Sequence, residues 1–148
     1  KWLTPRVALN LHLEIATRTL RDLRPVMARP LDDKPWPYAF YEGIDRRAEY
    51  YEGLLPFHGA LQMFRHRSEA LARQHARIAA TSRELIENSF PAEIVQDQTL
   101  MPQLQLILSI EVWQRLRDQQ KMGVGEVSSL VSSMAQALLA AAGKPVGQ

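Results

Sequence analysis

The chain contains no cysteine among its 148 residues. This excludes disulfide scaffolds, thiolate metal sites and cysteine nucleophiles. It also agrees with a reducing cytoplasm, where we expect the protein to reside. The net charge is small too, because 18 Lys and Arg residues and 16 Asp and Glu residues leave a formal charge of +2. That value falls well short of the basic surface that binding to a phosphate backbone requires.

Long apolar runs are also missing. No purely apolar run approaches the roughly 20 residues needed to span a bilayer. The charged start at Lys1 is not followed by the apolar core of a signal peptide. We therefore expect no membrane partner. The chain opens almost directly on a helix signal at Thr4-Pro5, so we expect either that a segment upstream has been cut away or that the chain is a relative without it.

Signals for β-structure are absent as well. Apolar and polar residues do not alternate over the length of a strand, and no Asn-Gly or Asp-Gly turn occurs. The sequence therefore predicts an all-α fold. A chain of this length suits one domain, residues 1–148, with a single core.

Capping and breaking residues divide the chain into helices. Thr4 and Pro5 open the first helix, and Pro25 ends it. An exposed connection with a buried Trp36 is expected from Met27 to Pro37. Pro56 kinks or restarts the second helix. The remaining helices are predicted over Tyr38–Leu55, Phe57–His66, Ser68–Phe90, Thr99–Gln120 and Glu126–Ala142.

The predicted helix Thr99–Gln120 is apolar in nearly every direction, so it must be covered on most sides. The helix after it has an apolar flank and a serine-rich flank that allows close approach. Two copies of this pair would form a four-helix interface by two-fold symmetry. The predicted homodimer interface comprises Leu106, Ile110, Trp113, Val127, Leu130, Val131, Met134 and Leu138. Coverage of all this surface within one chain is the alternative.

Catalytic and metal-binding motifs are missing. None of the four histidines belongs to a His-x-x-x-His or Glu-x-x-His pair, and no Gly-rich phosphate loop occurs. We therefore expect neither metal nor cofactor nor catalytic site. An enzyme would depend on Glu111 with His58 or His75, the one acid–base pairing available.

The central aromatic residues indicate a pocket for a small apolar or aromatic molecule, although ordinary core packing explains them equally well. Glu111 is either a buried carboxylate facing a ligand or the partner of Arg115. The run Arg65-His66-Arg67 suits a phosphate or a solvated turn. The candidate ligand-binding residues are Tyr50, Tyr51, Leu54, Phe57, His58, Leu61, Phe64, His75, Ile78, Leu104, Leu108 and Glu111.

Residues 109–117 follow the pattern Ser-x-Glu-x-Trp-x-x-Leu-Arg, and a Gly-containing break and the Val127–Leu139 helix come after them. This arrangement resembles the last two helices of TetR-type (TetR/AcrR) transcriptional regulators of bacteria. Upstream, Asp45–Glu52 and Phe64–Ser68 look like the corresponding central helices. The resemblance covers about the whole chain, but its motifs are loose helix patterns.

The resemblance implies a homodimeric effector-binding domain of a transcriptional repressor. In that family an effector moves a joining helix, here Thr4–Arg24, and so releases operator DNA from an N-terminal helix-turn-helix. That DNA-binding region is missing from this chain. Lys121 also stands where the family commonly has Gly, and Gly123 where it has a capping Ser. A helical adaptor for protein partners, without a cavity, is the alternative function.

Overall fold

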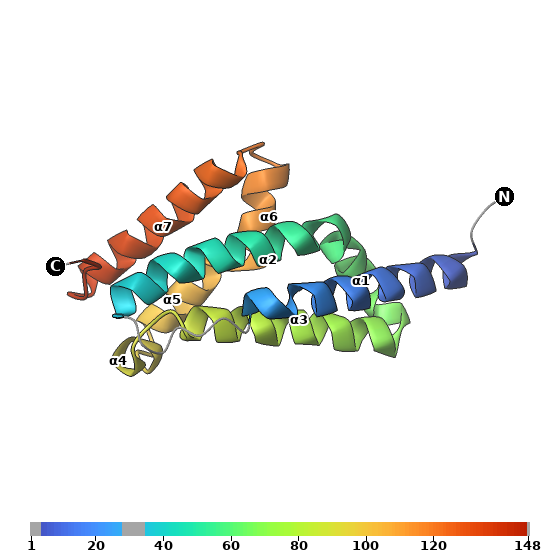
Figure 1. Ribbon diagram of the computed structural model, residues 1–148, viewed down its shortest axis with the longest axis horizontal. Helices are drawn as coiled ribbons and strands as arrows, with labels where there is room; N and C mark the ends of the chain where they lie inside the picture. Colours follow the sequence, from blue (N-terminus) through green and yellow to red (C-terminus); the bar gives the residue numbers. More distant parts are fainter. Residues whose placement is uncertain (1–3, 28–34, 148) are drawn as a thin grey trace. The chain divides into compact units, whose positions relative to one another are not determined.

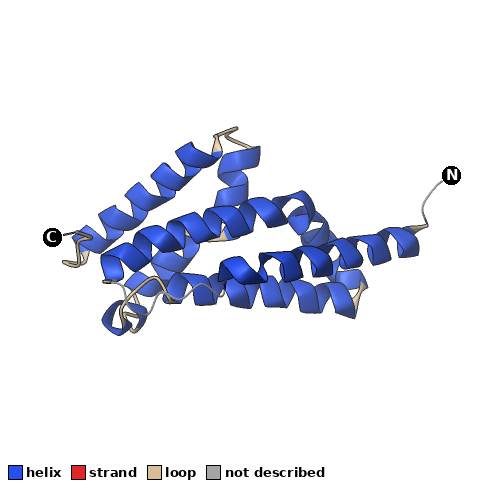
Figure 2. Cartoon of the chain, viewed as in Figure 1, coloured by secondary structure: helices blue, strands red, loops and turns tan. Residues whose placement is uncertain are grey.

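A computed structural model describes residues 4–27 and 35–147 of the chain. Over those ranges every regular element is a helix and no strand occurs, which confirms the predicted all-α class (Figures 1 and 2). Most of the predicted connection between Met27 and Pro37 lies outside the described residues. The elements are α1 (Pro5–Met27), α2 (Trp36–Phe64), the 3-10 turn η1 (Arg65–Arg67), α3 (Glu69–Glu87), α4 (Ala92–Val95), α5 (Leu100–Ile107), α6 (Ile110–Asp118) and α7 (Val124–Ala141).

The chain forms two compact units. Unit 1 comprises Lys1–Arg29 and Glu49–Thr81, and unit 2 comprises Pro30–Ala48 and Ser82–Gln148. Unit 1 therefore contains α1, the second half of α2 and most of α3. Unit 2 contains the first half of α2, the end of α3, and α4 to α7 (Figure 1).

Two helices begin at the predicted hydroxyl caps. The Thr4 Oγ1 atom accepts a hydrogen bond from the Val7 backbone N–H at 3.3 Å. The Ser68 Oγ atom accepts one from the Leu71 N–H at 3.4 Å. Each bond satisfies a backbone donor that the first turn of a helix leaves unpaired. Local side-chain chemistry therefore sets where α1 and α3 start.

Two prolines do not end their helices. Pro25 lies inside α1 and Pro56 inside α2, so the predicted end at Pro25 is wrong, and Pro56 interrupts no helix. A proline inside a helix costs about 3 kcal/mol, since it removes one N–H donor and crowds a carbonyl. Leu54 and Leu61, on either side of Pro56, are fully buried. Burial of such side chains offsets the lost hydrogen bond.

In unit 1, α1 contacts both other helices. The Gln74 Nε2 atom on α3 donates a hydrogen bond to Thr17 Oγ1 at 2.8 Å. The rings of His12 on α1 and Phe64 on α2 lie 6.1 Å apart. A β-carbon added at Gly53 would come within 2.9 Å of the Leu23 side chain, so α1 and α2 approach closely at this glycine.

In unit 2, the predicted helix Thr99–Gln120 is two helices, and the prediction of one is wrong. The chain breaks at Leu108 and Ser109. The Ser109 hydroxyl donates to the Leu106 carbonyl at 2.7 Å and accepts from the Val112 N–H at 3.3 Å, so it joins the end of α5 to the start of α6. The break changes the helical phase. Each helix then buries a single face, formed by Leu100, Met101 and Leu104 on α5 and by Ile110, Trp113 and Leu116 on α6.

Helix α7 returns along α5 and α6, as Figure 1 shows. It begins at Val124, two residues before the predicted start, and Gly125 lies in its first turn. It ends before Gly143, whose positive φ of 75° is a common way to stop a helix. Its buried residues are Val127, Val131, Ala135 and Leu139.

The first half of α2 contributes an arginine to the core of unit 2. Arg47 is buried, and its Nη1 atom donates to Ser89 Oγ at 3.2 Å. The Ser89 hydroxyl in turn donates to the Leu85 carbonyl at 2.9 Å. Beside this network the ring of Phe90 lies 6.4 Å from that of Trp36, in line with the prediction that Trp36 is packed rather than free.

Candidate functional site

Unit 1 holds most of the predicted ligand-binding residues. Phe64 and His75 are half-buried. The buried members are Tyr50, Tyr51, Leu54, Phe57, His58, Leu61 and Ile78. One face of α2 supplies nearly all of them, because they recur at three- and four-residue steps. The predicted apolar face is therefore present, and its role in ligand binding remains a prediction.

Two histidines from different helices meet within this face. The rings of His58 on α2 and His75 on α3 have centroids 6.2 Å apart and an interplanar angle of 14°. The Arg65 Nη1 atom approaches His75 Nε2 to 3.4 Å. The structure thus brings together His58 and His75, two of the candidate ligand-binding residues.

Among the described residues of unit 1, the buried side chains of Tyr50 and Gln74 each carry a polar atom without a hydrogen bond of good geometry. The Tyr50 hydroxyl lies near Thr81 without forming a bond of good geometry. Burial raises the pKa of this phenol above its usual value, so it stays protonated. The Oε1 atom of Gln74 is the second unpaired group. Such atoms are uncommon in native proteins and are often satisfied by a ligand or an ordered water.

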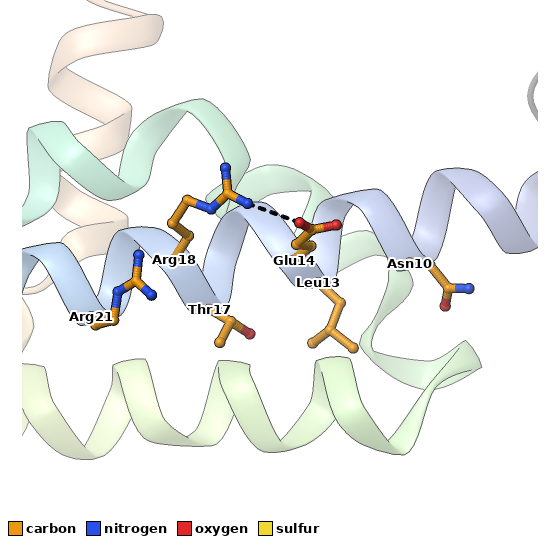
Figure 3. Close-up of a pocket in the computed structure, with 6 residues that line it drawn as sticks. All are labelled: Asn10, Leu13, Glu14, Thr17, Arg18 and Arg21. Atoms are coloured by element: carbon orange, nitrogen blue, oxygen red, sulfur yellow. Dashed lines mark hydrogen bonds and ion pairs between the residues drawn. The ribbon is translucent and has the colours of Figure 1, made fainter.

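An open pocket of about 470 Å³ lies on α1 and includes Thr17 in its lining. Its lining residues in the described part of the chain come from α1, and they are Asn10, Leu13, Glu14, Thr17, Arg18 and Arg21 (Figure 3). None of them was predicted from the sequence. Apart from Leu13 they are polar or charged residues of an amphipathic helix, and hydrophobic periodicity treats such residues as plain solvent-exposed surface.

The remaining predicted ligand residues belong to unit 2. Leu104 and Leu108 are buried there. Glu111 is exposed, so it is not the buried carboxylate that the sequence left open. A shallow pocket of about 270 Å³ also occurs in this unit, between the start of α5 and the end of α7. At its edge the backbone N–H groups of Leu100 and Thr99 hold the pKa of Asp97 below its usual value.

The predicted dimer residues fall into two groups. Ile110, Trp113, Val127 and Val131 are already buried within the chain, so they have little surface left to cover. Leu106 is 65% exposed. Leu130, Met134 and Leu138 are half-exposed and follow one another along α7. We call these three residues the α7 flank, because they form the apolar side of α7 next to its buried stripe.

Helix α7 is also the one helix in the described ranges that is long and apolar enough, by length and composition, to cross a membrane. The sequence had predicted no membrane partner. A core helix of a soluble protein passes the same test, and α7 packs on α5 and α6 along its buried stripe. The apolar surface of α7 beyond that stripe suits either a protein partner or lipid.

The turn between α6 and α7 has a definite backbone conformation. Lys121 has a φ of 55°, in the left-handed region. Gly123 then forms the N-cap of α7, and its backbone N–H donates to Glu126 Oε2 at 2.7 Å. Gly123 has no side chain of its own to accept from the first-turn N–H groups. The Arg117 side chain fixes the turn by donating to the Met122 carbonyl at 2.7 Å.

Replacing Lys121 by glycine is expected to stabilise the protein by about 0.5–1 kcal/mol, because glycine adopts the left-handed conformation without the strain of a β-carbon. Thermal unfolding followed by circular dichroism measures the effect. Lys121→Ala is the control, since it removes the charge but keeps the β-carbon. A rise in Tm with alanine equal to that with glycine would assign the effect to charge.

Within residues 4–27 and 35–147, no group of three His, Cys, Asp or Glu side chains is placed to hold a metal ion. Comparison of the chain with protein-family models, with curated proteins and with solved structures finds no match. The chemistry of the candidate site therefore comes from the buried aromatic and histidine side chains of unit 1 and from the open pocket on α1.

Proposed function

We propose that the chain is the effector-binding and dimerisation domain of a TetR-type transcriptional repressor. The residues that resemble this family form α6 and α7, and Ser109 begins α6 as a hydroxyl cap. The two departures from the family pattern also support the proposal. Lys121 adopts the backbone conformation that glycine favours, and Gly123 occupies an N-cap position that serine favours.

The α7 flank is the observation that carries dimerisation. Leu130, Met134 and Leu138 are half-exposed on a helix whose buried stripe already packs on α5 and α6. An apolar strip of this kind gains free energy when a second copy covers it. Two-fold symmetry lets the same strip serve both partners.

We expect Leu130→Glu to raise the dissociation constant of the dimer at least a hundredfold, or about 3 kcal/mol. A carboxylate at this position would be desolvated and unpaired in the interface. Analytical ultracentrifugation over a range of concentrations measures the change. Ser129→Glu is the matched control, because Ser129 is exposed and lies away from the α7 flank. A parent chain that is monomeric at micromolar concentration would overturn the proposed dimer.

The effector site of this proposal is the buried face of unit 1. Its aromatic side chains suit a small apolar or aromatic molecule, and the Tyr50 hydroxyl and the His58–His75 pair supply polar groups for orientation. An effector acts by binding one arrangement of the dimer more tightly than the other. Operator DNA would be bound by the helix-turn-helix of the longer protein.

A helical adaptor is a second candidate, favoured by one observation on α1. Val7, Leu11 and Ile15 recur at four-residue steps and are all more than two-fifths exposed. Apolar side chains aligned along an exposed helix are typical of a surface for a protein partner. Native mass spectrometry with a panel of small aromatic compounds distinguishes the candidates. Absence of any bound compound would favour the adaptor.

A further inference from the structure

We infer that the open pocket on α1 binds a small organic anion, namely a carboxylic acid with a short apolar body. The pocket measures about 470 Å³, within the range of about 300–1,000 Å³ that is typical of small-molecule sites. Its lining combines two guanidinium groups, one carboxylate, two uncharged polar side chains and a leucine. No residue of this pocket belongs to the predicted effector face, and the inference does not rest on the proposed function.

The lining residues recur along one side of α1 from Asn10 to Arg21. Figure 3 shows Leu13 and Thr17 pointing toward α3, whereas Arg18 and Glu14 meet on the opposite border of the same face. The lining therefore offers one apolar side chain, that of Leu13, beside polar and charged groups. A ligand with one apolar and one charged end matches this arrangement.

The charge of the lining favours an anion. Two arginines stand against one carboxylate, that of Glu14, whose Oε1 atom lies 2.9 Å from Arg18 Nη2. Among the described side chains, Arg21 forms an ion pair with Asp22 at 3.5 Å, and Asp22 is not a lining residue of the pocket. Exposed pairs of this kind are worth less than about 1 kcal/mol, so a ligand carboxylate can displace them. A guanidinium offers a carboxylate two parallel N–H donors.

The buried side-chain amide of Gln74 forms a hydrogen bond to Thr17, a lining residue of the pocket. Gln74 is only 7% exposed, and its Nε2 atom donates to the Thr17 hydroxyl oxygen at 2.8 Å. The Thr17 oxygen therefore accepts the hydrogen bond from Gln74. The hydroxyl hydrogen of Thr17 is then available to an acceptor in the pocket. The Oε1 atom of the same amide is buried without a partner, so the Gln74–Thr17 pair is incompletely satisfied. A carboxylate oxygen beside Thr17 would accept the hydroxyl hydrogen.

Isothermal titration with octanoate and with 1-octanol tests the inference on the chain as it stands. Both probes share the apolar body, and only octanoate carries a carboxylate. We expect octanoate to bind at least tenfold more tightly than 1-octanol. Arg21→Gln should weaken octanoate binding about tenfold and leave 1-octanol unchanged. Leu13→Trp, which fills the pocket, should weaken both.

Arg115→Gln is the matched control, because Arg115 is an exposed arginine on α6 outside the pocket. Circular dichroism verifies that each variant is folded, and Thr17→Val tests the hydroxyl separately. Equal affinity for the two probes, or no binding of octanoate, would overturn the inference. So would an effect of Arg21→Gln no larger than that of the control. The dimer measurement above is unaffected by any of these results.

Discussion

Trp113→Ala should lower the free energy of unfolding by about 3–5 kcal/mol, the usual cost of removing a large aromatic side chain from a core. Trp113 is only 2% exposed and belongs to the largest fully buried side chains of the described residues. The substitution leaves a cavity in unit 2, where α6 packs on α7. Urea unfolding followed by circular dichroism, at one protein concentration, measures the loss.

This variant also separates two roles for the same residue, because the sequence placed Trp113 in the dimer interface. If Trp113 mainly contacted a second copy of the chain, the Trp113→Ala variant would be folded and monomeric. Its single chain would then lose little stability. Trp113→Phe is the control, since it keeps an aromatic ring and is expected to lose less. A Trp113→Ala protein that is monomeric and as stable as its parent would restore the interface role.

Gly43→Ala should destabilise the protein by about 2–4 kcal/mol through overpacking and loss of a buried hydrogen bond. A β-carbon added at Gly43 would stand 2.1 Å from Ser89 Oγ. The hydroxyl must then leave its position between Arg47 Nη1 and the Leu85 carbonyl. Chemical denaturation of the single variant measures the cost.

Gly125→Ala is the matched control, because Gly125 is also helical but an added β-carbon there would meet nothing within 4 Å. Alanine is the better helix former, so this control should be neutral or slightly stabilising. Combining Gly43→Ala with Ser89→Gly removes the clash and should recover part of the lost stability. If the two alanine variants had equal stability, the close approach at Gly43 would be unimportant.

The positions where helices start could be read from the sequence where a local cap decides them. Thr4 and Ser68 each satisfy a backbone N–H three residues on, and this chemistry needs no tertiary context. Breaks inside apolar segments were harder to predict. Ser109 carries the same capping chemistry, but continuous apolar residues on both sides concealed it. At Pro25 and Pro56 the sequence predicted an end or an interruption of the helix, and the structure has neither. Packing there outweighs the low helix propensity of proline.

The candidate site was predictable only in its apolar part. The spacing of Tyr50, Leu54 and Leu61 placed them on one face, and burial follows from that pattern. Buried charge leaves no such pattern, and nothing in the sequence predicted that Arg46 and Arg47 are both buried. The pocket on α1 was missed for a related reason. The polar face of a helix has the same sequence pattern whether it lies on open surface or lines a pocket.

The distribution of tryptophan between the two units has a spectroscopic consequence. Trp36 and Trp113 both belong to unit 2, and the single tryptophan in the sequence of unit 1, Trp2, lies outside the described residues. Intrinsic tryptophan fluorescence therefore reports mainly on the unfolding of unit 2. Far-ultraviolet circular dichroism reports on the helices of both units. Coincident melting curves would indicate one cooperative transition. Separate midpoints would mean that α2 and α3, which run through both units, can fray over part of their length while the rest stays helical.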